Sequence, residues 1–85
     1  MYSIEFTRQA TMVLQSMPRN VRELVREKVQ ALARDPYASS ANVTRLQGRP
    51  EFRLRVQDWR VIYRVVDDRL VLLVIKIGAR GEVYR

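Results

Sequence analysis

Five residues in the second half of the chain have the types and spacing needed to act on a phosphodiester. Arg53, Arg55, Arg60, Arg80 and Tyr84 fall in what the sequence predicts to be one small sheet. Side chains two residues apart in a strand point to the same face, so Arg53 and Arg55 should lie side by side. A fixed array of guanidinium groups suits a phosphate, especially one whose charge grows during a reaction. Since the chain has no histidine and no cysteine, this array is the main indication of function.

The positive charge is concentrated in the same half of the chain. The net charge is +7, and arginine supplies fourteen of the sixteen basic side chains. Residues 45–85 carry ten basic and five acidic side chains, against six and four in residues 1–44. Arginine favours planar, bidentate phosphate contacts, although a high-GC coding bias would also enrich it. The clustering is therefore better evidence for a phosphate-binding surface than the total.

The composition also restricts the class of protein. A length of 85 residues predicts a single domain that spans residues 1–85. Without cysteine or histidine there is no disulfide framework and no thiolate or imidazole metal site, so we expect no cofactor and no metal. The longest apolar run, Leu70–Ile77, is too short to cross a bilayer, and Met1–Glu5 does not resemble a signal peptide. We expect a cytoplasmic protein.

Two amphipathic helices are predicted in the first half of the chain. A short strand, Tyr2–Phe6, precedes Thr7, which is a suitable N-cap for a helix that runs to about Met17. Pro18 breaks this helix, and a second apolar stripe continues through Arg34 until Asp35-Pro36 ends it. The opposite face of the second helix, with Arg19, Glu23, Arg26 and Glu27, is expected to be solvated surface. The pattern predicts a helical hairpin.

After a predicted loop over residues 36–50, the apolar period changes from helical to two. Phe52–Gln57 alternates, and turns at Gln57-Asp58 and Asp67-Asp68 lead into predicted strands Trp59–Val66 and Leu70–Ile77. The last of these is apolar on both faces, as is typical of a central strand, and Gly78 should end it before a short pairing at Val83-Tyr84. The fold class is therefore α+β, with an N-terminal strand and a helical hairpin packed on a small antiparallel sheet.

The order of these elements and their residues resemble the RelE/ParE superfamily of bacterial and archaeal type II toxins, over essentially the full length. The segments that carry the resemblance are RLQGRPEFRLRVQDWRVIYRV (residues 45–65) and VVDDRLVLLVIKIGARGEVYR (residues 65–85). They contain a leucine-glycine loop, basic residues two apart on a strand, an arginine and tyrosine on the next strand, and a terminal G-x-R-x-x-V-Y pattern. Each piece is weak alone, but together and in order they are fairly specific for the superfamily.

The resemblance implies a RelE-like ribosome-dependent endoribonuclease, which cuts messenger RNA in the ribosomal A site. Its catalytic set maps onto Arg53, Arg55, Arg60, Arg80 and Tyr84. Three further cations, Arg45, Arg49 and Lys76, are predicted to bind RNA. Two features depart from the family pattern: the positions of Arg53 and Arg55 are often lysine, which can lose a proton, and the chain stops one residue after Tyr84.

The implied chemistry is attack of the ribose 2′-OH on the adjacent phosphorus. Arginines would stabilise the phosphorane, while Tyr84, whose pKa neighbouring guanidinium groups should lower, is the candidate base or proton shuttle. Arg53, Arg55 and Arg80 would act on the scissile phosphate, and Arg60 would position it or assist the leaving group. Glu82 is a second candidate for the base and ranks below Tyr84.

Each residue also has a purely structural interpretation. Arg53 and Arg55 could form the solvated face of a half-buried strand, Arg60 could pair with Asp58, and Tyr84 could be a packing residue at a chain end. Arg64 and Arg69 have no family counterpart and are interpreted as surface or ion-paired residues. The aromatic side chains of Phe52, Trp59 and Tyr63 are expected to pack in the core or on the sheet rather than to stack on bases.

Two other functions remain open. One is a ParE-type inhibitor that binds DNA gyrase and has no nuclease chemistry; the other is a regulatory member that binds only antitoxin and operator DNA. The expected partners are a neutralising, acidic-leaning antitoxin, the bacterial ribosome and its mRNA, with operator DNA bound only through the antitoxin complex and no membrane. The charge of +7 and the free sheet edges are the physical reasons for expecting such an antitoxin.

Overall fold

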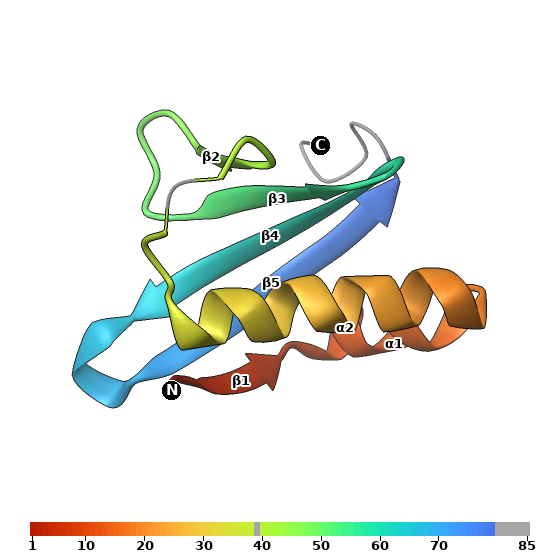
Figure 1. Cartoon of the computed structure of the whole chain (residues 1–85), viewed down its shortest axis with the longest axis horizontal. Coiled ribbons are helices and arrows are strands. Elements are labelled where there is room, and N and C mark those ends of the chain that lie inside the picture. Colours follow the sequence, from red (N-terminus) through yellow and green to blue (C-terminus); the bar gives the residue numbers. More distant parts are fainter. Residues whose placement is uncertain (39, 80–85) are drawn as a thin grey trace.

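Two helices lie on one face of a five-stranded sheet in the computed structural model, which describes residues 1–38 and 40–79 (Figure 1). The sheet order is β1-β5-β4-β3-β2, and the predicted α+β class is confirmed. In chain order the elements are β1 (Ser3–Phe6), α1 (Arg8–Ser16), α2 (Arg19–Arg34), β2 (Val43–Arg45), β3 (Phe52–Val56), β4 (Trp59–Val66), a 3-10 turn (Asp67–Arg69) and β5 (Val71–Ala79).

The helix ends follow the predicted signals. Thr7 is the N-cap of α1, where its hydroxyl accepts a hydrogen bond from the Ala10 amide at 3.3 Å. Pro18 separates the helices as the N-cap of α2, and Asp35 ends α2 with its amide bonded to the Ala31 carbonyl at 3.3 Å. No helix within the described residues is long and apolar enough to cross a membrane.

The sheet is mixed rather than wholly antiparallel. Strands β2 to β5 form an antiparallel meander, but β1 pairs in parallel with β5, in a register that aligns Ser3 with Val71 and Phe6 with Val74. The helical hairpin explains the difference, because parallel neighbours need a crossover connection rather than a tight turn. Beyond Phe6, the Thr7 hydroxyl donates to the Ile75 carbonyl, and the Gln9 amide exchanges two hydrogen bonds of 3.0 Å with the backbone of Ile77. These side chains occupy the edge of β5 that β1 leaves uncovered.

Three predictions of strand limits were wrong. Residues 36–50 are not entirely loop, because Val43–Arg45 form the edge strand β2. Gly78 does not end the last strand, which continues to Ala79 through pairing with Trp59. The strand also starts at Val71, since Leu70 has a left-handed backbone with φ of 53°. The predicted pairing at Val83-Tyr84 lies outside the described residues.

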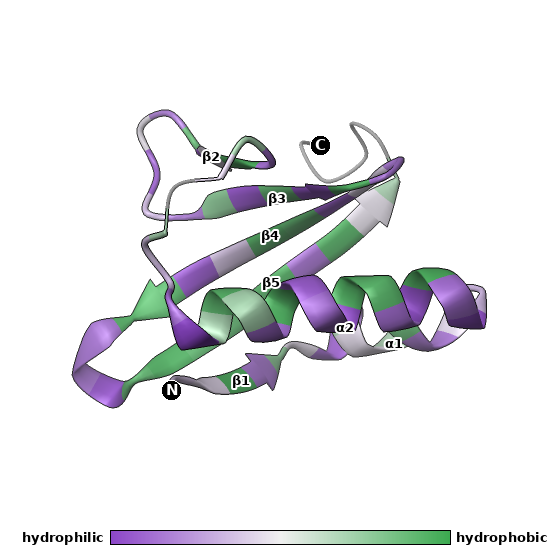
Figure 2. Cartoon of the chain, in the orientation of Figure 1, coloured by the Kyte–Doolittle hydropathy of each residue, from purple (hydrophilic) through white to green (hydrophobic). Residues whose placement is uncertain are grey.

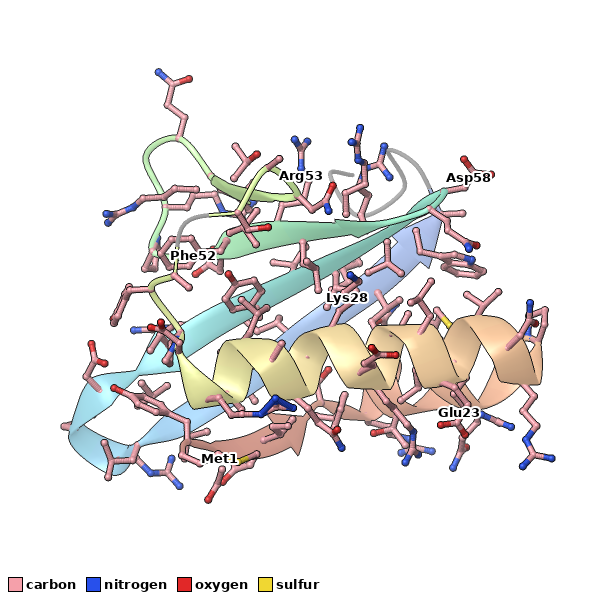
Figure 3. All side chains as sticks on the ribbon, viewed as in Figure 1. Met1, Glu23, Lys28, Phe52, Arg53 and Asp58 are labelled. Atoms are coloured by element: carbon pink, nitrogen blue, oxygen red, sulfur yellow. The ribbon has the colours of Figure 1, made fainter. Side chains whose placement is uncertain are left out.

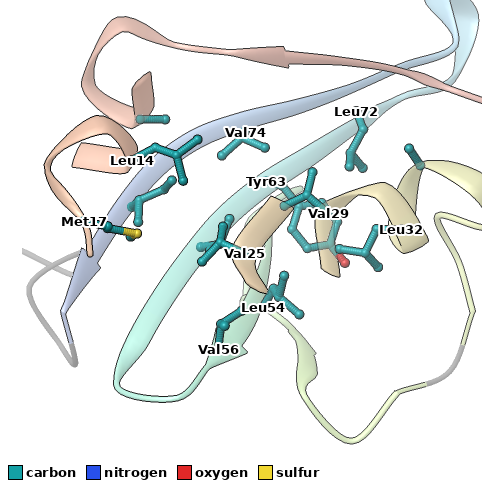
Figure 4. Close-up of a cluster of buried hydrophobic side chains, with 14 residues drawn as sticks. Leu14, Met17, Val25, Val29, Leu32, Leu54, Val56, Tyr63, Leu72 and Val74 are labelled. Atoms are coloured by element: carbon teal, nitrogen blue, oxygen red, sulfur yellow. The ribbon is translucent and has the colours of Figure 1, made fainter. Parts of the chain in front are cut away.

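The core lies between the helices and one face of the sheet. Apolar side chains of α1 and α2 pack with those of the strands, and the hydropathy colouring shows that apolar and hydrophilic residues alternate along both helices (Figure 2). The most deeply buried large side chains are those of Tyr63, Leu72, Ile77, Val25, Val29, Val61 and Val74, and most of them are labelled in Figure 4. The helices therefore cover one face of the sheet and leave the other for a functional surface.

Two tyrosine hydroxyls hydrogen-bond to the turn between β4 and β5. The Tyr2 hydroxyl donates to Asp67 at 2.7 Å, and the Tyr37 hydroxyl donates to the other oxygen of the same carboxylate at 2.6 Å. These hydrogen bonds hold the pKa of Asp67 below its usual value, and the bond to Asp67 raises the pKa of Tyr37 to about 12. One carboxylate thus joins the N-terminus, the segment after α2 and the sheet at the end remote from the β3–β4 turn.

Candidate basic site on the open face of the sheet

The sheet face opposite the helices carries the predicted arginines in two adjacent rows. The first row crosses three strands at Arg55 of β3, Arg60 of β4 and Gly78 of β5, which are direct partners in the register. The second row contains Arg53, Ile62 and Lys76. Neighbouring strands lie about 4.8 Å apart, and residues two apart along a strand about 6.6 Å apart. The predicted side-by-side placement of Arg53 and Arg55 is confirmed.

The hairpin register explains why Arg55 and Arg60 are paired. A two-residue turn at Gln57 and Asp58 joins β3 to β4, and Gln57 takes the positive φ of 54° that such tight turns require. Val56 then pairs with Trp59, and the next pair outward is Arg55 with Arg60. Directly opposed side chains have Cβ atoms about 4.5–5.5 Å apart, so two guanidinium groups share a small area.

A β-bulge brings Lys76 to the same face. On β5, Leu72 and Val74 face the helices, and strict alternation would put Lys76 there as well. The pairing with β4 shifts between Ile62 and Tyr63, so that Val74 pairs with Tyr63 and Lys76 pairs with Ile62. The extra residue reverses the alternation, because a bulge sets two residues of one strand against one of the other. Ile77 consequently takes its place in the core.

Arg55, Arg60 and Lys76 form no ion pair with an acidic side chain among the described residues. The ion pairs found there join Arg49 to Glu51 at 2.9 Å and Arg69 to Glu5 at 3.9 Å. Neither involves Arg55, Arg60 or Lys76. Opposed like charges without a counter-ion destabilise a strand pair, which is expected where the charges serve a ligand rather than the fold.

Hydrogen bonds to neutral groups orient the two paired arginines. The Arg60 guanidinium donates to the Gln57 and Trp59 carbonyls at 3.4 and 3.2 Å, which holds it beside the turn. The Arg55 guanidinium donates to the Asn42 side-chain oxygen at 3.5 Å. Since these acceptors carry no charge, both guanidinium groups keep their full attraction for an anion.

A cavity of about 450 Å³ opens where these side chains meet the helical layer. Arg55 and Arg60 line it together with Lys28 of α2, Asn42 before β2 and Asp58 of the turn. Lys28 rises from α2 towards the sheet, and Asp58 lies at the tip of the β3–β4 turn (Figure 3). The sequence did not single out Lys28 or Asn42, because only the packing angle of α2 and the path of the loop before β2 bring them to the arginines.

The other predicted site residues lie elsewhere or outside the described residues. Arg45 is on the helix-side face, with its guanidinium 5.8 Å from the centre of the Phe52 ring. Arg49 is exposed in the loop between β2 and β3, where it pairs with Glu51. Arg45 and Arg49 therefore both lie apart from the open-face row of Arg53. Arg80, Tyr84 and the alternative base Glu82 lie outside the described residues. Arg80 follows Ala79 directly in the sequence, and Ala79 pairs with Trp59, the neighbour of Arg60.

The remaining aromatic and basic residues take the structural roles predicted for them. Phe52 stacks on Tyr63 with ring centres 5.4 Å apart, Trp59 packs against the core, and Arg69 is ion-paired. The Tyr63 hydroxyl is buried without a hydrogen-bond partner among the described residues. Burial raises the pKa of Tyr63 to about 12, so this phenol is not suited to proton transfer at neutral pH.

The fold and site define a small basic α+β protein, in which a helical hairpin packs on a mixed sheet whose open face carries arginines. The family profile described as "ParE toxin of type II toxin-antitoxin system, parDE" matches residues 4–84. The chain belongs to this family, within the RelE/ParE superfamily, and is a RelE-like toxin of a type II toxin–antitoxin system.

Its relatives include proteins named mRNA interferases and solved structures of RelE toxins. The mRNA interferase toxin RelE of Escherichia coli K12 is 28% identical over 88 residues, which cover 98% of this chain and 90% of that protein. The isolated E. coli RelE toxin superposes with a TM-score of 0.81 at 28% identity, covering 99% of this chain and 92% of the other. RelE in the archaeal RelE–RelB complex from Pyrococcus horikoshii OT3 gives a TM-score of 0.82 at 28% identity, covering 95% and 97%.

Proposed function

We propose that the chain is an endoribonuclease that cleaves messenger RNA on the ribosome. The observation that carries this proposal is the direct opposition of Arg55 and Arg60 on the open face, without an acidic counter-ion among the described residues. Two adjacent guanidinium groups that repel each other are stabilised by an anion placed between them. The stabilisation increases as a phosphodiester becomes a more highly charged phosphorane, so the pair favours the transition state over the substrate.

In the proposed reaction the ribose 2′-OH attacks the adjacent phosphorus, and the bond to the 5′ oxygen breaks. Arg53 and Arg55 bind the scissile phosphate from β3, and Arg60 binds it from β4. Arg80 adds a further guanidinium group, and Tyr84 acts as the proton shuttle, which takes the 2′ proton and returns a proton to the leaving 5′ oxygen. The products then carry a 2′,3′-cyclic phosphate and a 5′-hydroxyl. The order of Ala79, paired with Trp59, and then Arg80 in the chain supports including Arg80 in this set.

The ribosome supplies the in-line geometry in this proposal. The open face offers cations but no pair of exposed aromatic rings among the described residues on which bases could stack, since Phe52, Trp59 and Tyr63 pack against the helices. A site of this kind binds phosphate without fixing the direction from which the 2′-OH attacks, and the orientation of the reacting groups is a large part of such catalysis. Free RNA should consequently be cut slowly or not at all.

We also propose that a neighbouring antitoxin neutralises the chain. Support comes from the E. coli RelBE toxin–antitoxin complex, whose toxin resembles this chain with a TM-score of 0.80 at 26% identity, and from the archaeal RelE–RelB complex. The charge of +7 favours an acidic-leaning partner. Operator DNA would be bound through that complex, because the antitoxin would cover the basic surface of the toxin.

A second candidate function is inhibition of DNA gyrase, which is favoured by the match to the ParE family profile. The two functions differ in what happens to mRNA. Cell-free translation with mapped mRNA 5′ ends should show new ends within codons at the A site when the purified chain is added. Gyrase cleavage complexes should not accumulate in a parallel supercoiling assay. Accumulation of those complexes with intact mRNA would contradict the nuclease proposal and support the second candidate.

Matched variants make the assay specific to the site. Arg60→Ala should abolish most new mRNA ends, whereas Arg64→Ala, on the same strand and face but opposite Leu73, should leave them in place. Tyr84→Phe keeps the ring and deletes the proton carrier, so its cleavage rate should fall and rise less with pH. Equal activity of all three variants would exclude the open face as the site of cleavage.

A further inference from the structure

We propose that the cavity beside the β3–β4 turn is a second RNA subsite, in which Lys28 and Arg55 bind the phosphate of a nucleotide adjacent to the scissile bond. This inference rests on the proposed nuclease function and extends it to a residue on the helical layer. The cavity lies at the edge of β3 beyond the end of β2, where α2 passes over the turn. Leu24 and Lys28 of α2 line it on the helix side, and Arg55 and Arg60 line it from the open face of the sheet.

The lining chemistry is that of an anion site. Three cations, Lys28, Arg55 and Arg60, line the cavity against one acid, Asp58. Lys28 is exposed and forms no ion pair within the described chain, and its compact ammonium group suits a single phosphate. The Asn42 side-chain oxygen accepts from Arg55 at 3.5 Å, which turns that guanidinium towards the cavity edge.

The size and floor of the cavity indicate a nucleotide rather than a lone ion. A volume of about 450 Å³ falls within the range of about 300–1,000 Å³ that is usual for small-ligand sites. Leu24 and Val56 form an apolar part of the lining against which a base or sugar can pack. Asp58 at the rim can accept a hydrogen bond from an exocyclic amino group, so it has a place in a nucleotide site.

Continuity with the open face determines where this nucleotide belongs in the substrate. Arg55 and Arg60 belong both to the paired row and to the cavity lining, so the two sites share side chains. A polynucleotide with its scissile phosphate on the row would place its neighbouring phosphate at the cavity. A protein carboxylate could also meet Lys28, but the shared arginines and the nucleotide-sized space favour RNA.

The subsite can be tested by binding alone, without ribosomes or cleavage. The probe is the 5′-phosphorylated deoxydinucleotide d(ApG), which has no 2′-OH and cannot be cut. Titration of the full chain should show that Lys28→Gln binds it at least fivefold more weakly, whereas Arg26→Gln, with the same loss of charge on the same helix, binds within twofold of the wild type. Lys28→Arg should restore most of the affinity.

The salt dependence distinguishes a phosphate contact from general charge. Losing one contact to a single strand should reduce the slope of log affinity against log salt by about 0.7 in Lys28→Gln but not in Arg26→Gln. In the translation assay Lys28→Gln should raise KM severalfold with little change in kcat, because the residue binds a part of the substrate that does not react.

The outcomes separate this inference from the proposed function. Equal losses of affinity in Lys28→Gln and Arg26→Gln, or no binding of the probe by the wild type, would overturn the subsite. Lys28-dependent binding of an acidic peptide but not of d(ApG) would overturn it in favour of a protein partner. If the wild type cuts no mRNA, the nuclease proposal fails, and the role of Lys28 in its substrate fails with it. Cleavage without a Lys28-dependent change in probe affinity or KM overturns the subsite alone.

Discussion

The opposition of Arg55 and Arg60 predicts that the candidate site lowers the stability of the fold that carries it. Like charges directly opposite each other in an antiparallel pair are destabilising, by amounts of about 0.2–1 kcal/mol. Coulomb's law gives a similar value, since two unit charges about 6 Å apart in water repel by about 0.7 kcal/mol. Arg55 is the better residue to change, because Arg60 donates to two backbone carbonyls that its loss would leave without their donor.

Arg55→Gln should therefore raise the free energy of unfolding by about 0.5 kcal/mol, which corresponds to about 2–4 °C in Tm for a domain of this size. Thermal unfolding at low salt, followed by circular dichroism, measures the change. In about 1 M salt, where the Debye length is about 3 Å, the gain should disappear. Under the proposed function, the same variant should cleave mRNA about 100-fold more slowly, because one donor to the transition state is lost.

Arg64→Gln is the matched control. Arg64 lies on the same face of β4 but opposite Leu73, so its replacement should change neither Tm nor cleavage appreciably. A loss of stability in Arg55→Gln that is equal at low and high salt would refute the reasoning. It would show that the hydrogen bond to Asn42 and the packing of the side chain outweigh the repulsion across the strands.

Substitutions at three further positions test the fold that carries the candidate site. Thr7→Ala should lower the free energy of unfolding by about 2 kcal/mol, because it removes both the cap of α1 and the hydrogen bond to Ile75. Thr7→Ser keeps the hydroxyl and should retain most of the wild-type stability. Chemical denaturation measures the free energy of unfolding of the two variants. Tyr63→Phe should raise stability at neutral pH by about 1 kcal/mol, since it removes a buried hydroxyl that has no partner among the described residues, and a decrease would reveal a bound partner. Because burial raises the pKa of Tyr63, the unfolded chain loses the phenolic proton at lower pH than the folded chain, and wild-type stability should fall as pH rises from about 10 to about 12. The urea midpoint of Tyr63→Phe should fall less steeply across that range. Asp67→Asn should remove the part of the stability that the wild type loses as pH falls below about 4, because the folded pKa of this carboxyl is lowered; an unchanged acid transition would count against the tyrosine pair as its cause.

Local signals in the sequence were sufficient for the helices and the central hairpin. Apolar spacing, the cap at Thr7 and the breaks at Pro18 and Asp35 are determined by neighbouring residues, so they can be interpreted without knowing the tertiary structure. The same holds for the placement of the arginines on β3 and β4, because the period of two and a two-residue turn determine that Arg53 and Arg55 share a face and that Arg60 opposes Arg55.

The remaining features depend on contacts between distant parts of the chain. The strand β2 is only three residues long and lies among turn-forming residues, so its pairing with β3 has no local signal. The parallel partner of β1 depends on how the helical hairpin crosses the sheet. Lys76 belongs to an apolar run without alternation, where only the bulge decides which face it occupies, and Lys28 reaches the arginines only through the packing of α2.

The parallel pairing of β1 with β5 has a consequence for synthesis of the chain. Thr7 and Gln9 contact residues 68 positions later, and β5 lies between β1 and β4. Chains emerge from the ribosome N-terminus first, so β1 and both helices leave the exit tunnel before the strand that completes their sheet has been made. Until then the core lacks the apolar side chains of β5, and the row of Arg55, Arg60 and Gly78 lacks its third member. The arginines of β3 and β4 can therefore pair early, but the sheet that supports them is completed only when β5 has been made and inserts between β1 and β4.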